Sequence, residues 1–217
     1  MFCFSLRSLV LAQRSLSRMR RGQVGLLLAL FCGAAPAVQA GPRPAFDCVK
    51  VQPGSMAALV CADAGLAQLD QQLSQVYSLA LKKAAKERPP LLKAEQRGWV
   101  KGRDECWKSQ DKPACVKDSY VHRIAELQAR YRLLPAQGPI RWACDGNAAK
   151  EVVVNFFATE PPTLVAEFGD SSSLMFAERS ASGSRYVGRN ESFWEHQGEA
   201  RIVWGYQAPE MVCRQPK

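Results

Sequence analysis

The chain has 217 residues, of which 29 are Lys or Arg, 20 are Asp or Glu and two are His, so the formal net charge is +9. This length suits one or two small domains. A strongly basic chain can bind nucleic acid, but that role needs a basic stripe interleaved with base-reading groups, and the sequence contains none. We therefore expect no nucleic-acid partner.

Residues 1–40 have the order of a secretory signal peptide. A basic stretch, residues 1–21, contains five arginines and no acidic residue, and an apolar run over residues 24–31 and a small-residue segment over residues 33–40 follow. That order predicts export with cleavage of the segment. Either Met1 or Met19 can be the start, because Met19 is itself followed by two arginines.

We place the signal-peptidase cut before Gly41, since Val38 and Ala40 are small enough for the −3 and −1 positions. An uncleaved anchor is disfavoured, because the apolar run is short for a bilayer core of about 30 Å. Lipid attachment at Cys32 is also disfavoured, because the bulky Phe31 precedes it where a small residue is needed.

Six cysteines remain after the predicted cut. They are Cys48, Cys61, Cys106, Cys115, Cys144 and Cys213. An even number in an exported chain indicates disulfides, and no C-x-x-C motif supports a metal site. Chain order favours two short pairs in the first half and one pair that brackets the second half. The expected bridges are Cys48–Cys61, Cys106–Cys115 and Cys144–Cys213.

Charge and composition divide the mature chain. Without the five signal arginines, 24 basic residues face 20 acidic ones, or +4. Residues 41–138 carry 16 basic and 10 acidic residues, or +6, and residues 139–217 carry 8 and 10, or −2. Two prolines and a glycine between Leu134 and Pro139 mark a linker. We therefore predict domains over residues 41–134 and 140–217, joined by a linker over residues 135–139.

The first domain has helical periodicity. Apolar residues recur at spacings of three and four from Leu66 to Ala80, which predicts a helix that ends before Pro89. Further helices are predicted over Leu92–Cys106 and Val116–Leu134. Three short helices bury little surface, so two local disulfides supply the missing constraint.

The second domain consists of strand-forming segments. They are residues 152–157, 163–168, 174–178, 184–187, 192–194 and 199–204. Short strands at this spacing predict a small antiparallel barrel or sandwich. A Cys144–Cys213 bridge would close a loop of about 70 residues, which the chain-entropy model values at about 4 kcal/mol.

Enzyme signatures are weak. A triad of Ser182, His196 and Glu199 is conceivable, but no nucleophile elbow supports it. The other histidine, His122, lies in a helical segment. No motif in the sequence marks a pair of carboxylates for sugar hydrolysis, and no phosphate-binding loop is present. We therefore expect a binding protein that is not an enzyme and has no cofactor, metal or small-molecule substrate.

The second domain resembles the MliC/PliC family of membrane-bound and periplasmic inhibitors of c-type lysozyme. The motifs that carry the resemblance are WACDG at 142–146, SASGSRY at 180–186, FW at 193–194, GEA at 198–200 and Cys213. The resemblance covers about 75 residues. It implies a barrel of eight antiparallel strands with one disulfide, and c-type lysozyme as the protein partner.

The first domain resembles the LprI-type domain, which is also tied to lysozyme inhibition. The carrying motifs are FDC at 46–48, CAD at 61–63, LAQLD at 66–70, Tyr77, QRxW at 96–99, RDxC at 103–106, Cys115 and YxxRI at 120–124. We expect most of these residues to pack or cap helices. Together the two resemblances predict an α+β protein in the periplasm of a Gram-negative bacterium.

The MliC/PliC resemblance also implies binding residues. In that family, a Ser in the Ser-Gly turn and a Lys after the Phe-Trp pair enter the lysozyme cleft. The Ser maps onto Ser182, and Gly183 lets the turn approach closely. The Lys position is occupied by His196, which is a departure from the family. The candidate lysozyme-binding residues are Ser182, Gly183, Arg185, Tyr186 and His196.

Competing interpretations remain open. Ser182-Gly183 is a turn dipeptide in any β protein, and Tyr186, Phe193, Trp194 and Trp204 are candidates for the core. The alternative function is a non-catalytic envelope scaffolding protein, whose basic helical domain binds anionic envelope polymers.

Overall fold

A computed structural model describes residues 41–86 and 90–216, and the predicted signal peptide lies outside these residues. In this part of the chain the four α-helices are α1 Met56–Ala62, α2 Ala64–Lys83, α3 Leu91–Asp104 and α4 Lys112–Arg130. Short 3-10 helices cover Cys48–Lys50, Ala84–Lys86 and Glu105–Lys108. The three predicted helices are confirmed as α2, α3 and α4, and α1 is an additional short helix.

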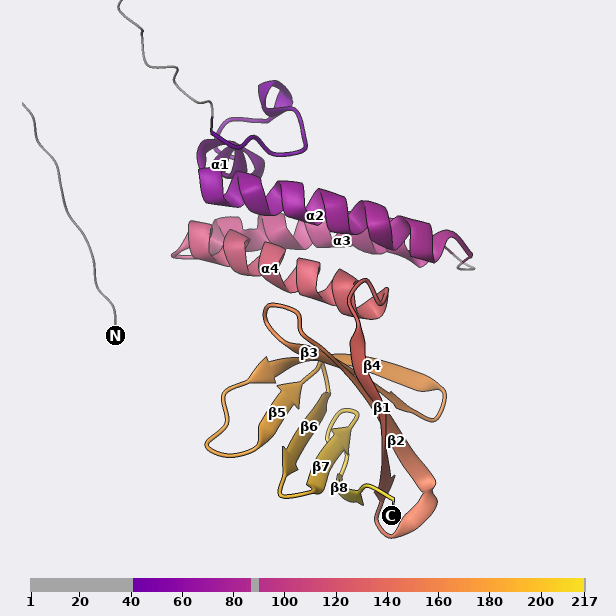
Figure 1. The fold of residues 1–217 in the computed structure, drawn as a ribbon. Helices are drawn as coiled ribbons and strands as arrows, with labels where there is room; N and C mark the ends of the chain where they lie inside the picture. Colours follow the sequence, from indigo (N-terminus) through magenta and orange to yellow (C-terminus); the bar gives the residue numbers. More distant parts are fainter. Residues whose placement is uncertain (1–40, 87–89, 217) are drawn as a thin grey trace, which may run out of the picture. The chain divides into compact units, whose positions relative to one another are not determined.

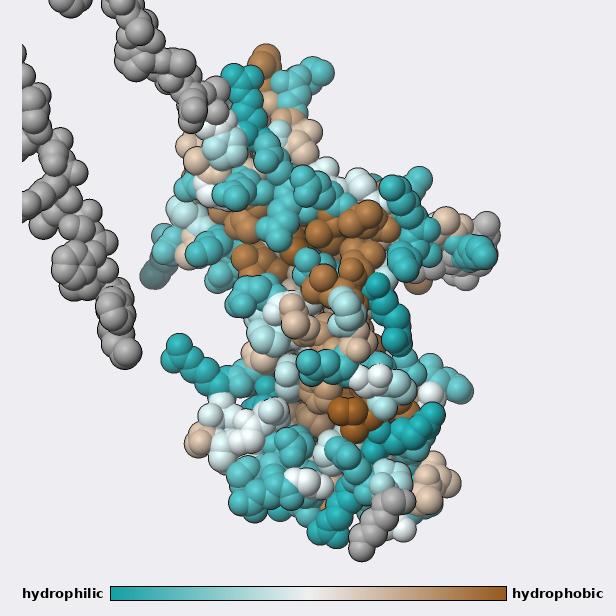
Figure 2. Space-filling model, viewed as in Figure 1, coloured by the Kyte–Doolittle hydropathy of each residue, from teal (hydrophilic) through white to brown (hydrophobic). Residues whose placement is uncertain are grey.

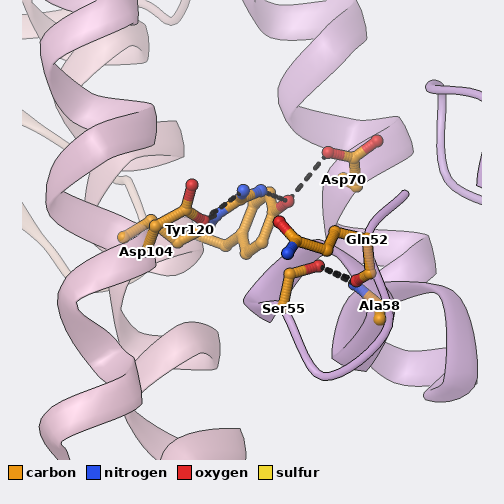
Figure 3. A network of polar contacts seen from close by, with 7 residues as sticks. Gln52, Ser55, Ala58, Asp70, Asp104 and Tyr120 are labelled. Carbon is orange, nitrogen blue, oxygen red and sulfur yellow. Dashed lines mark hydrogen bonds and ion pairs between the residues drawn. The ribbon is translucent and has the colours of Figure 1, made fainter. Parts of the chain in front are cut away.

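Side chains just outside the helices cap their N-termini. The Ser55 hydroxyl accepts a hydrogen bond from the Ala58 amide at the start of α1 and donates one to the carbonyl of Gln52 (Figure 3). Asp63 accepts from Leu66 at the start of α2, and Asp111 caps α4 in the same way. Each cap satisfies an amide that has no partner inside its helix.

The helices enclose a small core. α4 packs against both α2 and α3, and its buried residues Val116, Tyr120, Ile124 and Leu127 form the centre of that core. Disulfide Cys48–Cys61 ties the segment before α1 to α1, and Cys106–Cys115 ties the 3-10 helix after α3 to α4, as predicted. The covalent links compensate for a core that is small.

A polar network crosses this core and joins α2, α3 and α4. The Tyr120 hydroxyl donates to Asp70 Oδ1 over 2.8 Å and accepts from Arg103 Nη1 over 2.8 Å, and Arg103 also donates to Asp104 (Figure 3). Trp99 packs edge-to-face on the Tyr120 ring at 5.1 Å between centroids. Burial raises the pKa of Tyr120 well above its ordinary value, so the neutral phenol can both donate and accept. Several LprI-type motif residues are therefore structural.

Residues 136–214 form a closed barrel of eight strands in which each strand is antiparallel to its neighbours in sequence (Figure 1). The strands are β1 Ala136–Cys144, β2 Asn147–Phe157, β3 Thr163–Phe168, β4 Ser171–Glu178, β5 Ser184–Val187, β6 Glu191–His196, β7 Glu199–Trp204 and β8 Glu210–Arg214. The predicted barrel is confirmed. β1 includes most of the segment that composition marks as a linker, with a register break at Gly138-Pro139.

The barrel closes through a short seam between β1 and β8. Only Ala143 with Arg214 and Cys144 with Cys213 pair across it, and the second pair is the predicted third disulfide. Asp145, in the turn that follows β1, adds to the seam. Its amide donates to the carbonyl of Val212, and its carboxylate accepts from the Val212 amide over 3.0 Å.

Side chains alternate between the interior and the exterior of the barrel, as in any strand. The interior is filled by apolar residues, of which Trp142 and Phe193 are the largest, packed edge-to-face with 5.7 Å between centroids. Within residues 41–86 and 90–216, no helix is long and apolar enough to cross a membrane.

Candidate functional site

The Ser182 loop, residues 179–183, connects β4 to β5 and lies on the end of β6. Gly183 has a φ of +68°, and a Cβ on it would come within 2.0 Å of the Glu195 carbonyl oxygen and 3.1 Å of His196 Cβ. Only a residue without a Cβ permits this approach. The sequence-predicted role of Gly183 as a close-approach residue therefore has a geometric basis, although its contact is with the neighbouring strand of the same barrel.

Trp194, on β6, holds the same loop in place through a hydrogen bond. Its indole N–H donates to the carbonyl oxygen of Ser182 over 3.0 Å, and the Ser180 hydroxyl donates to that oxygen over 2.6 Å. Ser182 itself is exposed. Among the described residues, its hydroxyl has no hydrogen-bond partner, so the loop is fixed by its backbone while its side chain is available to another molecule.

The second loop is the tight turn between β6 and β7. His196 pairs with Glu199 across it, so Gln197 and Gly198 form a two-residue hairpin loop with φ values of +52° and +79°. Positive φ at both positions is typical of a type I′ turn. The Gly198 amide donates to Glu195 Oε1 over 3.2 Å, which fixes the turn further.

The two loops meet through Trp194. The His196 ring is stacked on the Trp194 ring with an interplanar angle of 5° and 6.0 Å between centroids. A cavity of about 250 Å³ lies beside this pair, lined by Trp194, His196, Gln197, Glu199 and Arg201. The prediction that Trp194 belongs to the core is wrong. It lies half-exposed on the outer face, because strand alternation directs its neighbour Phe193 inward.

Arg185 lies on the same outer face. It is opposite Trp194 in the pairing of β5 with β6, it is exposed, and it approaches Glu178 at 3.6 Å. An exposed ion pair of this kind contributes little stability and is easily exchanged for another carboxylate. Arg185 is therefore available for binding near both loops.

Tyr186 has a different position from the other candidates. It is half-buried and packs edge-to-face against Phe156, with 5.4 Å between ring centroids, and against Phe193 at 6.5 Å. Burial raises its pKa above the ordinary value for tyrosine. The structure thus brings Ser182, Gly183, Arg185 and His196 together on one face and places Tyr186 against the barrel core.

The hypothetical triad lacks its connecting bonds. In the described part of the chain, no hydrogen bond joins the Ser182 hydroxyl, the His196 ring and the Glu199 carboxylate. Glu199 instead accepts a hydrogen bond from Arg214 over 2.8 Å and lies 3.7 Å from Arg201.

Taken together, the fold is a disulfide-bonded helical part followed by a closed barrel that presents two adjoining loops. Comparison with known proteins identifies both parts. Residues 142–211 match the family described as membrane-bound lysozyme-inhibitor of c-type lysozyme, and residues 48–127 match the family described as lysozyme inhibitor LprI. Both families, and their order along the chain, are as the sequence motifs predict.

Curated relatives cover almost the whole chain. Lipoprotein LprI of Mycobacterium bovis is 31% identical over 195 residues, which span 87% of this chain and 94% of the relative. The same values hold for lipoprotein LprI of two Mycobacterium tuberculosis strains. The chain belongs to the LprI family. No solved structure matches it.

Proposed function

We propose that this chain inhibits c-type lysozyme by placing the Ser182 loop and the His196 turn in the catalytic cleft of the enzyme. The observation that carries the proposal is that the loop before β5 and the turn after β6 adjoin on one face, with Gly183 against Glu195 and His196. The family matches of both parts of the chain support the same partner.

The target offers two carboxyl groups with different charge states. A c-type lysozyme cleaves its substrate with one protonated carboxylic acid and one ionised carboxylate in a cleft. The Ser182 hydroxyl can donate to or accept from either group, and its lack of a partner within the described residues leaves both capacities free. Because the loop backbone is already held by Trp194, little conformational entropy is lost when it binds.

Cationic groups flank the hydroxyl. The Arg185 guanidinium can form a charge-assisted hydrogen bond with a carboxylate. His196 stands where the family that the barrel resembles has Lys, and its imidazole can donate a hydrogen bond to the same carboxylate. Residues 139–217 carry a net charge of −2, which favours encounter with a basic enzyme.

We further propose that the chain is not an enzyme and that it acts outside the cytoplasm, in the periplasm of a Gram-negative bacterium. Three disulfides among the described residues support an oxidising compartment. The curated relatives are named lipoproteins. Our proposal for this chain is cleavage before Gly41, and the intact mass of the exported protein tests it, since a retained lipid on Cys32 would overturn it.

The inhibition is tested with purified protein in a lysozyme assay that follows clearing of a bacterial cell-wall suspension. Wild-type protein should slow clearing, and Ser182→Ala should weaken inhibition by about tenfold, a value that corresponds to one lost hydrogen bond. Ser172→Ala is the matched control, because Ser172 is also exposed but is the second residue of β4, at the opposite end of that strand from the Ser182 loop. If the wild-type protein does not inhibit lysozyme, the proposed function is wrong. If it inhibits and Ser182→Ala does not weaken the inhibition, lysozyme binds to a surface other than the Ser182 loop and the His196 turn.

A further inference from the structure

The helical part of the chain has an apolar groove that the proposed lysozyme face does not use. α2 and α3 both pack against α4 but make few contacts with each other, so a space of about 420 Å³ remains between them. Pockets of about 300–1,000 Å³ are typical of ligand sites. The residues lining it include Phe46, Leu73, Tyr77, Trp99 and Val100. Figure 2 shows that hydrophobic side chains also reach the surface on the visible face of the helical part.

The groove is suited to an apolar ligand. Asp70 and Arg103 also line it, but Arg103 is only 5% exposed, and their polar atoms are already bonded to Tyr120, Asp104 and the Ala45 amide. A ligand that took the place of these partners would leave other buried polar groups without hydrogen bonds, which is unfavourable. The surface offered to a ligand is therefore mainly the hydrocarbon of the aromatic and aliphatic side chains.

A row of positive charges borders the groove on α3. Lys93, Arg97 and Lys101 follow one another at intervals of four residues, so they lie on one side of the helix, and all three are exposed. Arg97 is three residues from Val100, the groove residue that is 37% exposed, so the row and the groove lip are neighbours. Among residues 41–86 and 90–216, none of the three cations has an ion-pair partner.

We propose that this groove docks an acidic, amphipathic segment of a protein partner. Apolar side chains of that segment would fill the groove, and its carboxylates would face the α3 cations. Residues 41–138 carry a net charge of +6, which attracts an acidic partner over longer range. A concave apolar surface receives protruding side chains, whereas a bilayer surface needs an apolar group that protrudes into it. For this reason a protein segment is favoured over a membrane.

This docking site is independent of lysozyme inhibition. A basic lysozyme would be repelled by the α3 cations, so the inference gives the α2–α3 groove alone a partner other than lysozyme. Binding can be measured without lysozyme, and failure of one proposal therefore leaves the other standing.

The test uses purified protein with both parts of the chain intact and a set of fluorescein-labelled 18-residue peptides. Each peptide has apolar residues at i, i+3, i+4 and i+7 and glutamates elsewhere, and the set varies the apolar side chains. Fluorescence anisotropy should show saturable binding of at least one peptide, and the same peptide with lysines for glutamates should bind at least about tenfold more weakly.

Two variants locate the binding. The combined change Lys93→Glu, Arg97→Glu, Lys101→Glu should weaken binding by about tenfold or more, and so should Val100→Glu at the groove lip. The control Lys82→Glu, Lys83→Glu, Lys86→Glu changes the same charge on exposed residues outside the groove lining and should stay within about threefold of wild type. Lysozyme inhibition and circular dichroism of each variant show whether it is folded.

Several results would overturn the proposal. These are binding of no peptide in the set, equal binding of the lysine version, and equal loss in the control variant. Displacement of the peptide by lysozyme would identify the groove as part of the inhibitory surface. Binding of phosphatidylglycerol vesicles instead of peptides would identify a membrane site, and sedimentation that shows a dimer broken by Val100→Glu would identify a second copy as the occupant.

Discussion

The indole N–H of Trp194 donates a hydrogen bond to the carbonyl oxygen of Ser182, twelve residues earlier in the chain, over 3.0 Å. The same indole ring also stacks with the ring of His196. One side chain thus contacts both loops of the proposed lysozyme face. Its role is to position the groups that bind.

Trp194→Phe should keep an aromatic ring against His196 but remove the hydrogen bond to the Ser182 loop. One neutral hydrogen bond contributes about 0.5–1.5 kcal/mol, so inhibition of lysozyme should weaken about three- to tenfold. Hydrogen exchange of the amides in residues 180–184 should become faster in the free protein. Trp204→Phe is the control, because that indole N–H donates to Ser171 instead. Equal effects of both variants would argue against a positioning role.

Gly183→Ala should displace the Ser182 loop. The added Cβ would lie 2.0 Å from a backbone oxygen, and alanine at a φ of +68° costs about 1 kcal/mol or more in addition. We expect inhibition to fall by at least about tenfold, the loss of one good contact, while the barrel remains folded. Gly169→Ala shares the positive φ, at +56°, but meets no atom within 4 Å, so it isolates the backbone cost. Retained inhibition in Gly183→Ala would show that the loop position is unimportant.

Tyr120→Phe should destabilise the helical part. The hydroxyl is fully buried, and its loss leaves Asp70 Oδ1 and Arg103 Nη1 without their partner. A buried polar group that loses its partner costs about 1–3 kcal/mol, which urea denaturation can measure. Tyr77→Phe is the control, because no hydrogen bond involves the Tyr77 hydroxyl within the described residues. Similar stabilities of the two variants would show that the network contributes little.

The turn residue Asp145 should make barrel stability depend on pH. The Lys150 ammonium, 2.5 Å away, and the Val212 amide lower the pKa of Asp145. A lowered folded-state pKa contributes stability that is present above the unfolded pKa, about 3.9, and lost as pH falls through the folded value. Asp145→Asn should therefore lower Tm at pH 7, and this difference should shrink as the pH falls below about 4. A difference that is constant with pH would rule out the ionised carboxylate as its source.

Much of the fold follows from the sequence. The spacing of Leu66, Leu69 and Leu73 predicts α2, and strand-forming runs with turn residues between them predict β2 to β7. The disulfide pairing follows from chain order, because two bridges are local in the helical part and closure of the barrel brings Cys144 of the first strand beside Cys213 of the last. β1 is not predicted because Gly138-Pro139 resembles a linker, although the strand continues past it after a break in register.

The site is less predictable, for physical reasons. The motifs indicate Ser182 and His196 individually, but the contact between their loops depends on strand register and on the close approach at Gly183. The outward direction of Trp194 could have been predicted, because adjacent strand residues point to opposite faces and Phe193 fills the interior. The α2–α3 groove carries no sequence signal, since it depends on how far apart two helices lie on a third.

The last prediction concerns pH and His196, the residue that replaces the family Lys. In the proposed complex the imidazole faces a lysozyme carboxylate. Protonated imidazole attracts that group, so its contribution to binding is complete in acid and is lost as the pH rises and the ring becomes neutral. Affinity for lysozyme should therefore be greater at pH 5.5 than at pH 8.

The catalytic acid of lysozyme itself titrates near pH 6, about the same range, so the wild-type profile alone does not identify the group. His196→Lys resolves this, because lysine stays charged throughout and the lysozyme contribution is common to both proteins. The variant should bind about tenfold more tightly than wild type at pH 8, as expected for a charged in place of a neutral hydrogen bond, and should lose most of that advantage at pH 5.5. Isothermal titration calorimetry at both pH values measures the difference directly. If the ratio of the two affinities is the same at pH 5.5 and pH 8, His196 does not face the carboxylates, and the second loop of the proposed interface is misplaced.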